Sequence, residues 1–195
     1  MTPPANAYRG RIWALFAAQM ADIGPQRRVL DFGCGDGWFA RQMLDAGFTS
    51  DLVALDVKRR AHCFVEPKIY DGGSIPFADR SFELSYSVDV VHHCTDPLAA
   101  LTELARVSAR FVLLKDHTAS SPLGHLTLAV LDELGNRRFG IPSPHHYQQG
   151  DTWHQHLMSL GWQRRQHLHP AKVHTGLLGA LTNRLQHVSL YERVD

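Results

Sequence analysis

The residues best suited to chemistry lie in a glycine-rich segment near the start of the chain. A short segment that predicts a strand, 28–32, leads directly into Gly33, Gly35 and Gly37. Glycine has no Cβ, so a ligand can approach this backbone closely, and a following helix adds unpaired N–H groups. Open α/β sheets bind nucleotides at such strand-to-helix turns. The segment therefore predicts a site for a nucleotide-like cofactor.

The acidic residue before the glycines discriminates between two kinds of cofactor. A dinucleotide site favours the spacing G-x-G-x-x-G, because the pyrophosphate lies against the helix N-terminus. Here the spacing is G-x-G-x-G, and Trp38 stands where the last glycine would be. The carboxylate of Asp31 repels a pyrophosphate but suits an ammonium group. A nicotinamide-dependent oxidoreductase is therefore the less favoured alternative, and no Tyr has a Lys four residues later, as a short-chain dehydrogenase requires.

Four motifs occur in an order and at spacings typical of one enzyme family. They are 29–37, Leu55-Asp56, Asp71-Gly72 with 75–77 and 81–83, and 88–93. With them, the stretch from about Arg28 to His117 resembles class I S-adenosylmethionine-dependent methyltransferases, most closely the small ubiquinone/menaquinone-methyltransferase-like group. A narrower resemblance is to a bacterial subgroup of unknown substrate; it is carried by 114–117 (Leu-Lys-Asp-His), Leu131-Asp132, Gly135-Asn136 and 140–142.

The resemblance implies that S-adenosylmethionine is the cofactor and that ten residues bind it. Asp56 would take the ribose hydroxyls, Asp71 and its neighbour would contact the adenine, and 88–93 would line the methionine end. The implied set is Asp31, Gly33, Cys34, Gly35, Asp56, Val57, Asp71, Gly72, Val88 and Asp89. One departure is the short interval from Asp56 to Asp71, which leaves room for little helix and predicts an exposed adenine side.

The expected fold is a Rossmann-like, doubly wound α/β fold with a mostly parallel seven-stranded sheet and an antiparallel last strand. Apolar patterns predict helices at 8–22, 38–46, 97–105, 121–136 and 152–160, and strands at 28–32, 52–55, 81–88, 109–114, 162–168 and 185–191. Asp96 would cap the third helix, and Leu98, Leu101, Leu104 and Ala105 would form its buried stripe. We expect one domain, 1–195, with an N-terminal helix (8–27), a cofactor-binding half (28–117) and an acceptor-side half (118–195) that includes a loop at 136–150.

The chemistry that this fold would carry is methyl transfer to a small-molecule acceptor by in-line displacement. Such a reaction needs alignment of the reactants, and it needs a general base when the acceptor is a hydroxyl or an amine. Candidate bases follow the fourth and fifth strands: Asp89, His92, His93, Asp116 and His117. We assign His117, Asp116 and His92 to catalysis. The alternatives are that His92 and His93 are a packed and solvated pair, and that His117 only closes a loop through a structural hydrogen bond.

Composition narrows the remaining choices. The net charge of +1 provides no basic field for nucleic acid, and no apolar run reaches the length of a membrane span. The three cysteines, Cys34, Cys63 and Cys94, lack C-x-x-C spacing, which favours a reducing, cytoplasmic location. The histidine pairs of the C-terminal half match no metal motif, so we expect no metal. A non-catalytic, cofactor-binding scaffold of the same fold remains open.

Overall fold

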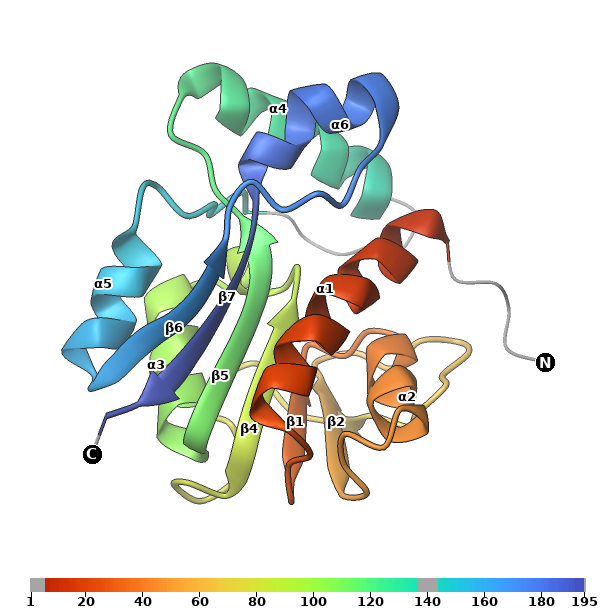
Figure 1. Ribbon diagram of the computed structural model, residues 1–195, viewed down its shortest axis with the longest axis vertical. Helices are drawn as coiled ribbons and strands as arrows, with labels where there is room; N and C mark the ends of the chain where they lie inside the picture. The colour runs from red at the N-terminus through yellow and green to blue at the C-terminus, as the bar shows by residue number, and fades with distance from the viewer. Residues whose placement is uncertain (1–5, 137–143, 195) are drawn as a thin grey trace.

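A seven-stranded β-sheet runs through the part of the chain that the computed structural model describes, residues 6–136 and 144–194 (Figure 1). The strands lie in the order β3-β2-β1-β4-β5-β7-β6. Neighbours pair in parallel except at β7, which is antiparallel to both β5 and β6. The predicted Rossmann-like fold, with its antiparallel last strand, is confirmed.

Most elements lie close to their predicted positions. The strands are β1 (Val29–Phe32), β2 (Leu52–Asp56), β3 (Lys68–Ile69), β4 (Phe82–Val88), β5 (Ser108–His117), β6 (Trp162–Leu168) and β7 (Gln186–Arg193). The helices are α1 (Ala7–Ile23), α2 (Trp38–Asp45), α3 (Pro97–Val107), α4 (Pro122–Asn136), α5 (Thr152–Ser159) and α6 (Gly176–Thr182), with 3-10 turns η1 (Val91–His93) and η3 (Asn183–Leu185). The elements that the sequence patterns missed, β3, α6 and the two 3-10 turns, are all short.

Both faces of the sheet are buried by helices. Residues of β5 alternate: Val112 and Leu114 join a core with α3 and α5, while Phe111 and Leu113 join a second core with α1 and α2. This alternation follows from the two-residue period of a strand. The strand is also longer than predicted, because it continues through Asp116 and His117 rather than ending at Leu114.

Helix α3 confirms its predicted start but not its whole buried stripe. The Asp96 carboxylate accepts hydrogen bonds from the backbone N–H groups of Leu98 and Ala99, at 2.9 and 3.0 Å. Leu101, Leu104 and Ala105 are buried as predicted. The prediction for Leu98 was wrong: this side chain is 42% exposed, because the first turn of α3 precedes the stretch that packs on the sheet.

The connection between β2 and β3 is short, as the sequence interval indicated. Residues 57–67 form bends and turns and contain no helix. The five parallel strands β1 to β5 bring the carboxyl ends of β1, β2, β4 and β5 to one edge of the sheet, and both residues of β3 are exposed beside it. In the described ranges, no helix combines the length and apolar character needed to cross a bilayer.

Candidate active site

The glycine turn after β1 is shaped by close contacts on two of its three glycines. Gly33, Gly35 and Gly37 have φ angles of 73°, 61° and 73°, a region that disfavours side chains. A Cβ on Gly33 would lie 2.3 Å from Cγ1 of Val90, and one on Gly37 would lie 2.7 Å from the carbonyl oxygen of Val65. A Cβ on Gly35 would meet nothing within 4 Å. Gly35 therefore presents bare backbone to open space, where a ligand can approach.

Asp31 is a buried carboxylate that lacks a full set of partners. The residue is 2% exposed, and its Oδ2 has no hydrogen-bond partner among the described residues. Burial, together with the charges of Asp56 and Asp36, raises the pKa of Asp31 to about 7, although Tyr86 and the backbone of Ala40 partly offset the shift. An ammonium group placed against Oδ2 would satisfy the carboxylate and neutralise it. A cationic ligand group at this end of β1 would therefore lower the pKa of Asp31.

Asp56 joins the end of β2 to the glycine turn. Its Oδ2 accepts a hydrogen bond from the backbone N–H of Gly35 at 2.8 Å, and its Oδ1 accepts one from the backbone N–H of Lys58 at 3.0 Å. Cys34, between the glycines, is buried, and burial raises the pKa of its thiol. Val57 is exposed, and a Cβ on Gly72 would lie only 3.4 Å from it.

The predicted cofactor residues lie in two neighbouring groups, one at the ends of β1 and β2 and one at the end of β4. The structure brings together Asp31, Gly33, Cys34, Gly35 and Asp56 at the ends of β1 and β2, with Val57, Asp71 and Gly72 exposed beside β3. Val88 and Asp89 lie at the end of β4, and the close approach of Gly33 to Val90 connects them to the glycine turn.

A buried lysine organises the end of β4. Lys115 is fully buried; its Nζ donates to an Asp89 carboxylate oxygen, to the Tyr8 hydroxyl at 2.7 Å and to Gln186 Oε1 at 2.7 Å. The Tyr8 hydroxyl donates in turn to Asp89 Oδ2 at 2.7 Å. Burial would raise the pKa of Asp89, but the charges of Lys115 and His117 outweigh it and lower the pKa. Asp89 is therefore an anion that also anchors helix α1.

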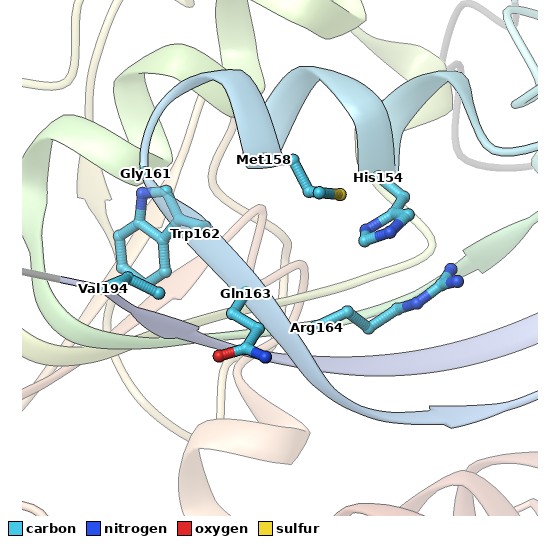
Figure 2. A pocket seen from close by; sticks show the side chains of 7 residues that line it. All are labelled: His154, Met158, Gly161, Trp162, Gln163, Arg164 and Val194. Atoms are coloured by element: carbon cyan, nitrogen blue, oxygen red, sulfur yellow. The ribbon is translucent and has the colours of Figure 1, made fainter.

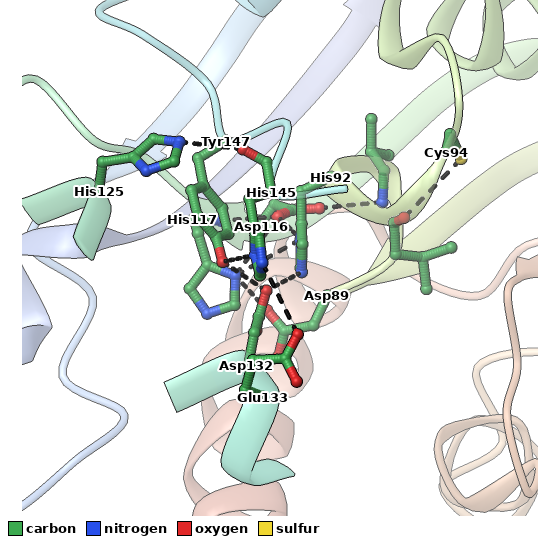
Figure 3. A network of polar contacts seen from close by, with 12 residues as sticks. Asp89, His92, Cys94, Asp116, His117, His125, Asp132, Glu133, His145 and Tyr147 are labelled. Atoms are coloured by element: carbon green, nitrogen blue, oxygen red, sulfur yellow. Dashed lines mark hydrogen bonds and ion pairs between the residues drawn. The ribbon is translucent and has the colours of Figure 1, made fainter. Parts of the chain in front are cut away.

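His92 lies between two carboxylates (Figure 3). Its Nδ1 is 2.5 Å from Asp116 Oδ1, and its Nε2 is 3.3 Å from Asp132 Oδ2. Burial would lower the pKa of His92, but the charges and hydrogen bonds of Asp116 and Asp132 raise it to about 10. The Tyr147 hydroxyl donates to Asp132 Oδ2 at 2.6 Å. A chain of polar contacts thus runs from Tyr147 through Asp132 and His92 to Asp116.

His117 stands at the outer end of this cluster, as the last residue of β5. Its Nδ1 lies 3.6 Å from both Asp89 Oδ1 and Asp116 Oδ1, and 3.5 Å from His92 Nδ1. Its backbone N–H donates to Asp116 Oδ1 at 2.7 Å. Because Nδ1 is turned toward the carboxylates (Figure 3), Nε2 is the ring nitrogen directed away from them. The imidazole is therefore held on its Nδ1 side.

His93 differs from His92 although the two are adjacent in η1. His92 is fully buried and His93 is half-buried. Burial and the charge of His92 lower the pKa of His93 to about 4. One imidazole of the pair is thus held as a cation and the other as a neutral ring.

Two groups in this cluster have the composition of a metal site. His92, His93 and Asp132 form one, and His92, Asp116 and His117 form the other; within each group the candidate ligand atoms lie within 4.8 Å of one another. Both groups share His92, whose two nitrogens already face carboxylates. This cationic imidazole has no lone pair for a metal, so an ion would first have to displace a proton.

Four residues of the cluster were not identified from the sequence as site residues: Tyr8, Lys115, Asp132 and Gln186. Lys115 carried one local signal, because it directly follows the apolar run 111–114. Its partners come from α1 and β7, far away along the chain. Of the predicted loop 136–150, residues 137–143 lie outside the described residues; from its remainder, Tyr147 reaches the cluster.

One cavity in the described structure lies away from these residues. It has a volume of about 550 Å³ and sits between α5 and the outer strand β6, lined by His154, Met158, Gly161, Trp162, Gln163, Arg164 and Val194 (Figure 2). None of these residues belongs to the glycine turn or to the polar cluster. Its position at the amino end of β6 separates it from the edge where the predicted site residues gather.

The fold and the glycine turn define the class of protein. A solved S-adenosylmethionine dependent methyltransferase from Mesorhizobium loti has the same fold, with a TM-score of 0.69 at 16% identity over 94% of this chain and 98% of that one. Residues 5–190 match the methyltransferase domain family. The chain belongs to this family, which confirms the predicted methyltransferase identity and, at the level of the family, the cofactor S-adenosylmethionine.

Two curated relatives show how the similarity is distributed. Malonyl-[acyl-carrier protein] O-methyltransferase of Erwinia billingiae is 39% identical over 90 residues, 43% of this chain and 35% of that protein. Demethylmenaquinone methyltransferase of Renibacterium salmoninarum is 26% identical over 175 residues, 78% of this chain and 73% of that protein. The chain spans about a third of the length of the malonyl-[acyl-carrier protein] O-methyltransferases that it matches.

Proposed function

We propose that this protein transfers a methyl group from S-adenosylmethionine to a small-molecule acceptor. The observation that carries the proposal is the close approach of Gly33 to Val90. It brings the glycine turn after β1 next to the cluster of histidines and aspartates. The two named relatives act on chemically different acceptors, so the acceptor of this chain is assigned only as a class. The net charge of +1 supports a small molecule rather than nucleic acid.

In this proposal the ends of β1 and β2 bind the cofactor. Asp31 binds the amino group, Gly35 and Gly33 let the methionine portion approach the backbone, and Asp56 is placed to receive the ribose hydroxyls. Cys34, Val57, Asp71 and Gly72 complete the ribose and adenine side, and Val88 and Asp89 border the methionine end. When bound, S-adenosylmethionine supplies an electrophilic methyl carbon that an acceptor lone pair attacks in line with the departing sulfur.

His117 is the proposed general base. An acceptor O–H or N–H that donates to Nε2 would pass its proton to the imidazole as the new bond to carbon forms. Asp116 and Asp89, each 3.6 Å from Nδ1, would stabilise the resulting imidazolium. His92, with its pKa raised to about 10, is already protonated at neutral pH. We therefore assign His92 a positioning role: it holds Asp116 in place and does not accept the proton.

The first test is calorimetric titration of the purified protein with S-adenosylhomocysteine and, in parallel, with NAD. We expect micromolar binding of S-adenosylhomocysteine alone, and loss of at least about tenfold in affinity in Asp56→Ala, which removes a charged hydrogen-bond acceptor. Binding of NAD alone would support the oxidoreductase alternative. Wild-type affinity in Asp56→Ala would remove this residue from the cofactor site.

The second test separates an enzyme from a cofactor-binding scaffold. Quinone-like, phenolic and lipid-precursor compounds are screened for S-adenosylhomocysteine release, and His117→Ala is assayed on any acceptor found. We expect a rate at least about a hundredfold lower with unchanged cofactor affinity, as for loss of a general base. The matched control is His62→Ala, an exposed histidine outside the cluster. An unchanged rate would remove His117 from the mechanism, and binding without turnover on any acceptor would favour the scaffold.

The proposed organisation is one domain, 1–195, in the cytoplasm. Strands from both the cofactor-binding half and the acceptor-side half pair in the same sheet, which supports a shared core. The three cysteines are free thiols, which supports a reducing location.

A further inference from the structure

Two neighbouring helices expose an unusual number of large apolar side chains. Leu123, Leu126 and Val130 on α4 are 65%, 61% and 50% exposed. On α6, Leu177, Leu178 and Leu181 are 77%, 46% and 54% exposed. The helices lie side by side above the carboxyl edge of the sheet (Figure 1), where Leu128 of α4 packs on Leu185 next to α6. We call these six exposed side chains the apolar cap.

The apolar cap differs from the solvent-facing side of an ordinary amphipathic helix. A surface helix normally buries its apolar stripe and turns charged residues outward. Here α6 buries Gly179 and Thr182 and turns its leucines outward. The exposed residues of α6 are all without hydrogen-bonding side chains: Gly176, Leu177, Leu178, Ala180 and Leu181. Exposed apolar patches of this kind mark binding surfaces.

The charged residues that border the apolar cap are mostly basic. Residues 118–131 and 173–183 contain no Asp, Glu, Lys or Arg. Lys172 and Arg184 flank α6 and are exposed, and Arg11 donates from Nε to the carbonyl of Val173 at 2.5 Å. Within the described part of α4 and α6, the exposed acidic residue is Glu133 of α4. The rim of the cap is therefore mainly cationic.

We propose that the apolar cap docks on an anionic lipid surface. A protein partner would require about one hydrogen bond per 100–200 Å² of interface, and the exposed residues of α6 supply none from their side chains. The acyl region of a bilayer requires none, and anionic headgroups complement Lys172, Arg184 and Arg11. The proposal is independent of the methyl acceptor, since it concerns only these two helices and their rim.

The test is co-sedimentation with vesicles of phosphatidylcholine and phosphatidylglycerol in equal parts, compared with phosphatidylcholine alone. We expect the full chain to bind the anionic vesicles more strongly. A triple variant, Leu177→Ser with Leu178→Ser and Leu181→Ser, should lower the partition coefficient by at least about tenfold. Lys172→Gln and Arg184→Gln should each lower binding to the anionic vesicles about fivefold. The matched control is Leu98→Ser, which removes an exposed leucine from α3.

Several results would overturn the proposal. These are a wild-type protein that binds neither vesicle, a triple variant that binds as the wild type does, or an equal loss in Leu98→Ser. A leucine-dependent dimer in sedimentation velocity without vesicle binding would assign the cap to a second copy instead. If the triple variant fails to fold, as judged by thermal unfolding, Leu123→Ser with Leu126→Ser on α4 gives the same comparison. S-adenosylhomocysteine affinity should be unchanged in every folded variant, which distinguishes failure here from failure of the proposed function.

Discussion

The ends of β1 and β2 and the ends of β4 and β5 hold buried charges in opposite ways. Asp31 is buried with an oxygen that no described residue satisfies, and its pKa is raised to about 7. Lys115 and His92 are also fully buried, but the protein itself supplies acceptors or opposite charges. Lys115 Nζ donates to Asp89, Tyr8 and Gln186, and each ring nitrogen of His92 faces a carboxylate. The first region would gain stability from a ligand that supplies a positive charge. In the second, the opposite charges are already present, so it can hold a reactive group in a fixed position.

Removing the buried cation Lys115, at the ends of β4 and β5, should have the largest effect on stability. In Lys115→Met, Asp89 keeps its charge but loses its neutralising partner, so the free energy of unfolding should fall by about 3–5 kcal/mol. Urea denaturation measures this change. Lys172→Met, at an exposed lysine, should change it by less than about 0.5 kcal/mol. Equal behaviour of the two variants would mean that the Lys115 network does not hold this region together.

Asp31→Asn should have opposite effects on binding and on stability. Affinity for S-adenosylhomocysteine should fall at least about tenfold, because a carboxylate to ammonium hydrogen bond is lost. The free energy of unfolding of the ligand-free protein at pH 8 should rise by about 1–3 kcal/mol, because an ionised carboxylate is no longer buried. Asp45→Asn, an exposed carboxylate on α2, should produce neither change.

The sign of the pH dependence follows from the raised pKa. Between its unfolded pKa near 3.9 and its folded pKa of about 7, Asp31 binds more protons in the folded protein. The wild type should therefore lose stability as the pH rises through this window, and Asp31→Asn should lose less. An identical slope in both proteins would contradict the assignment.

His92 should act in a higher pH window. Its folded pKa of about 10 exceeds the unfolded value near 6.5, so its contribution is fully present below pH 6.5 and is lost as the pH rises through 10. Asp132→Asn removes one of its two carboxylates and should lower the free energy of unfolding at pH 7 by about 1–2 kcal/mol. The slope between pH 7 and 10 should also flatten. Chemical denaturation across this range is the measurement, and a slope unchanged by Asp132→Asn would contradict the proposed charge of His92.

The smallest effect should come from Gly35→Ala. The φ angle of 61° should cost about 1 kcal/mol, and the new Cβ would project into the space assigned to the cofactor. Gly24→Ala is a matched control, since its φ is 74° and its Cβ also meets nothing within 4 Å. Both variants should lose similar stability, but only Gly35→Ala should lose affinity for S-adenosylhomocysteine. Equal affinity in the two would place the cofactor elsewhere.

The same two regions show what the sequence could predict. The turn from Asp31 to Gly37 was identified because its residues are contiguous and their types follow from local backbone geometry. The contacts of Lys115 were not, because they join residues 107 and 71 positions apart and depend on how α1 and β7 are placed. Helix α6 was missed for another reason: its seven residues are too few for a periodic signal, and its leucines face outward.

The position of β7 has a consequence for how the protein is made. Strand β7 lies between β5 and β6, and it pairs Phe111 with Glu192 and His117 with Gln186. During synthesis, β5 therefore has an open edge until the segment 186–193 leaves the ribosome. Until then Gln186 is also absent from Lys115, and the cluster around His117 is incomplete. We expect a nascent chain arrested before β7 to remain accessible to proteases and chaperones, even though every residue assigned to the cofactor has already been translated.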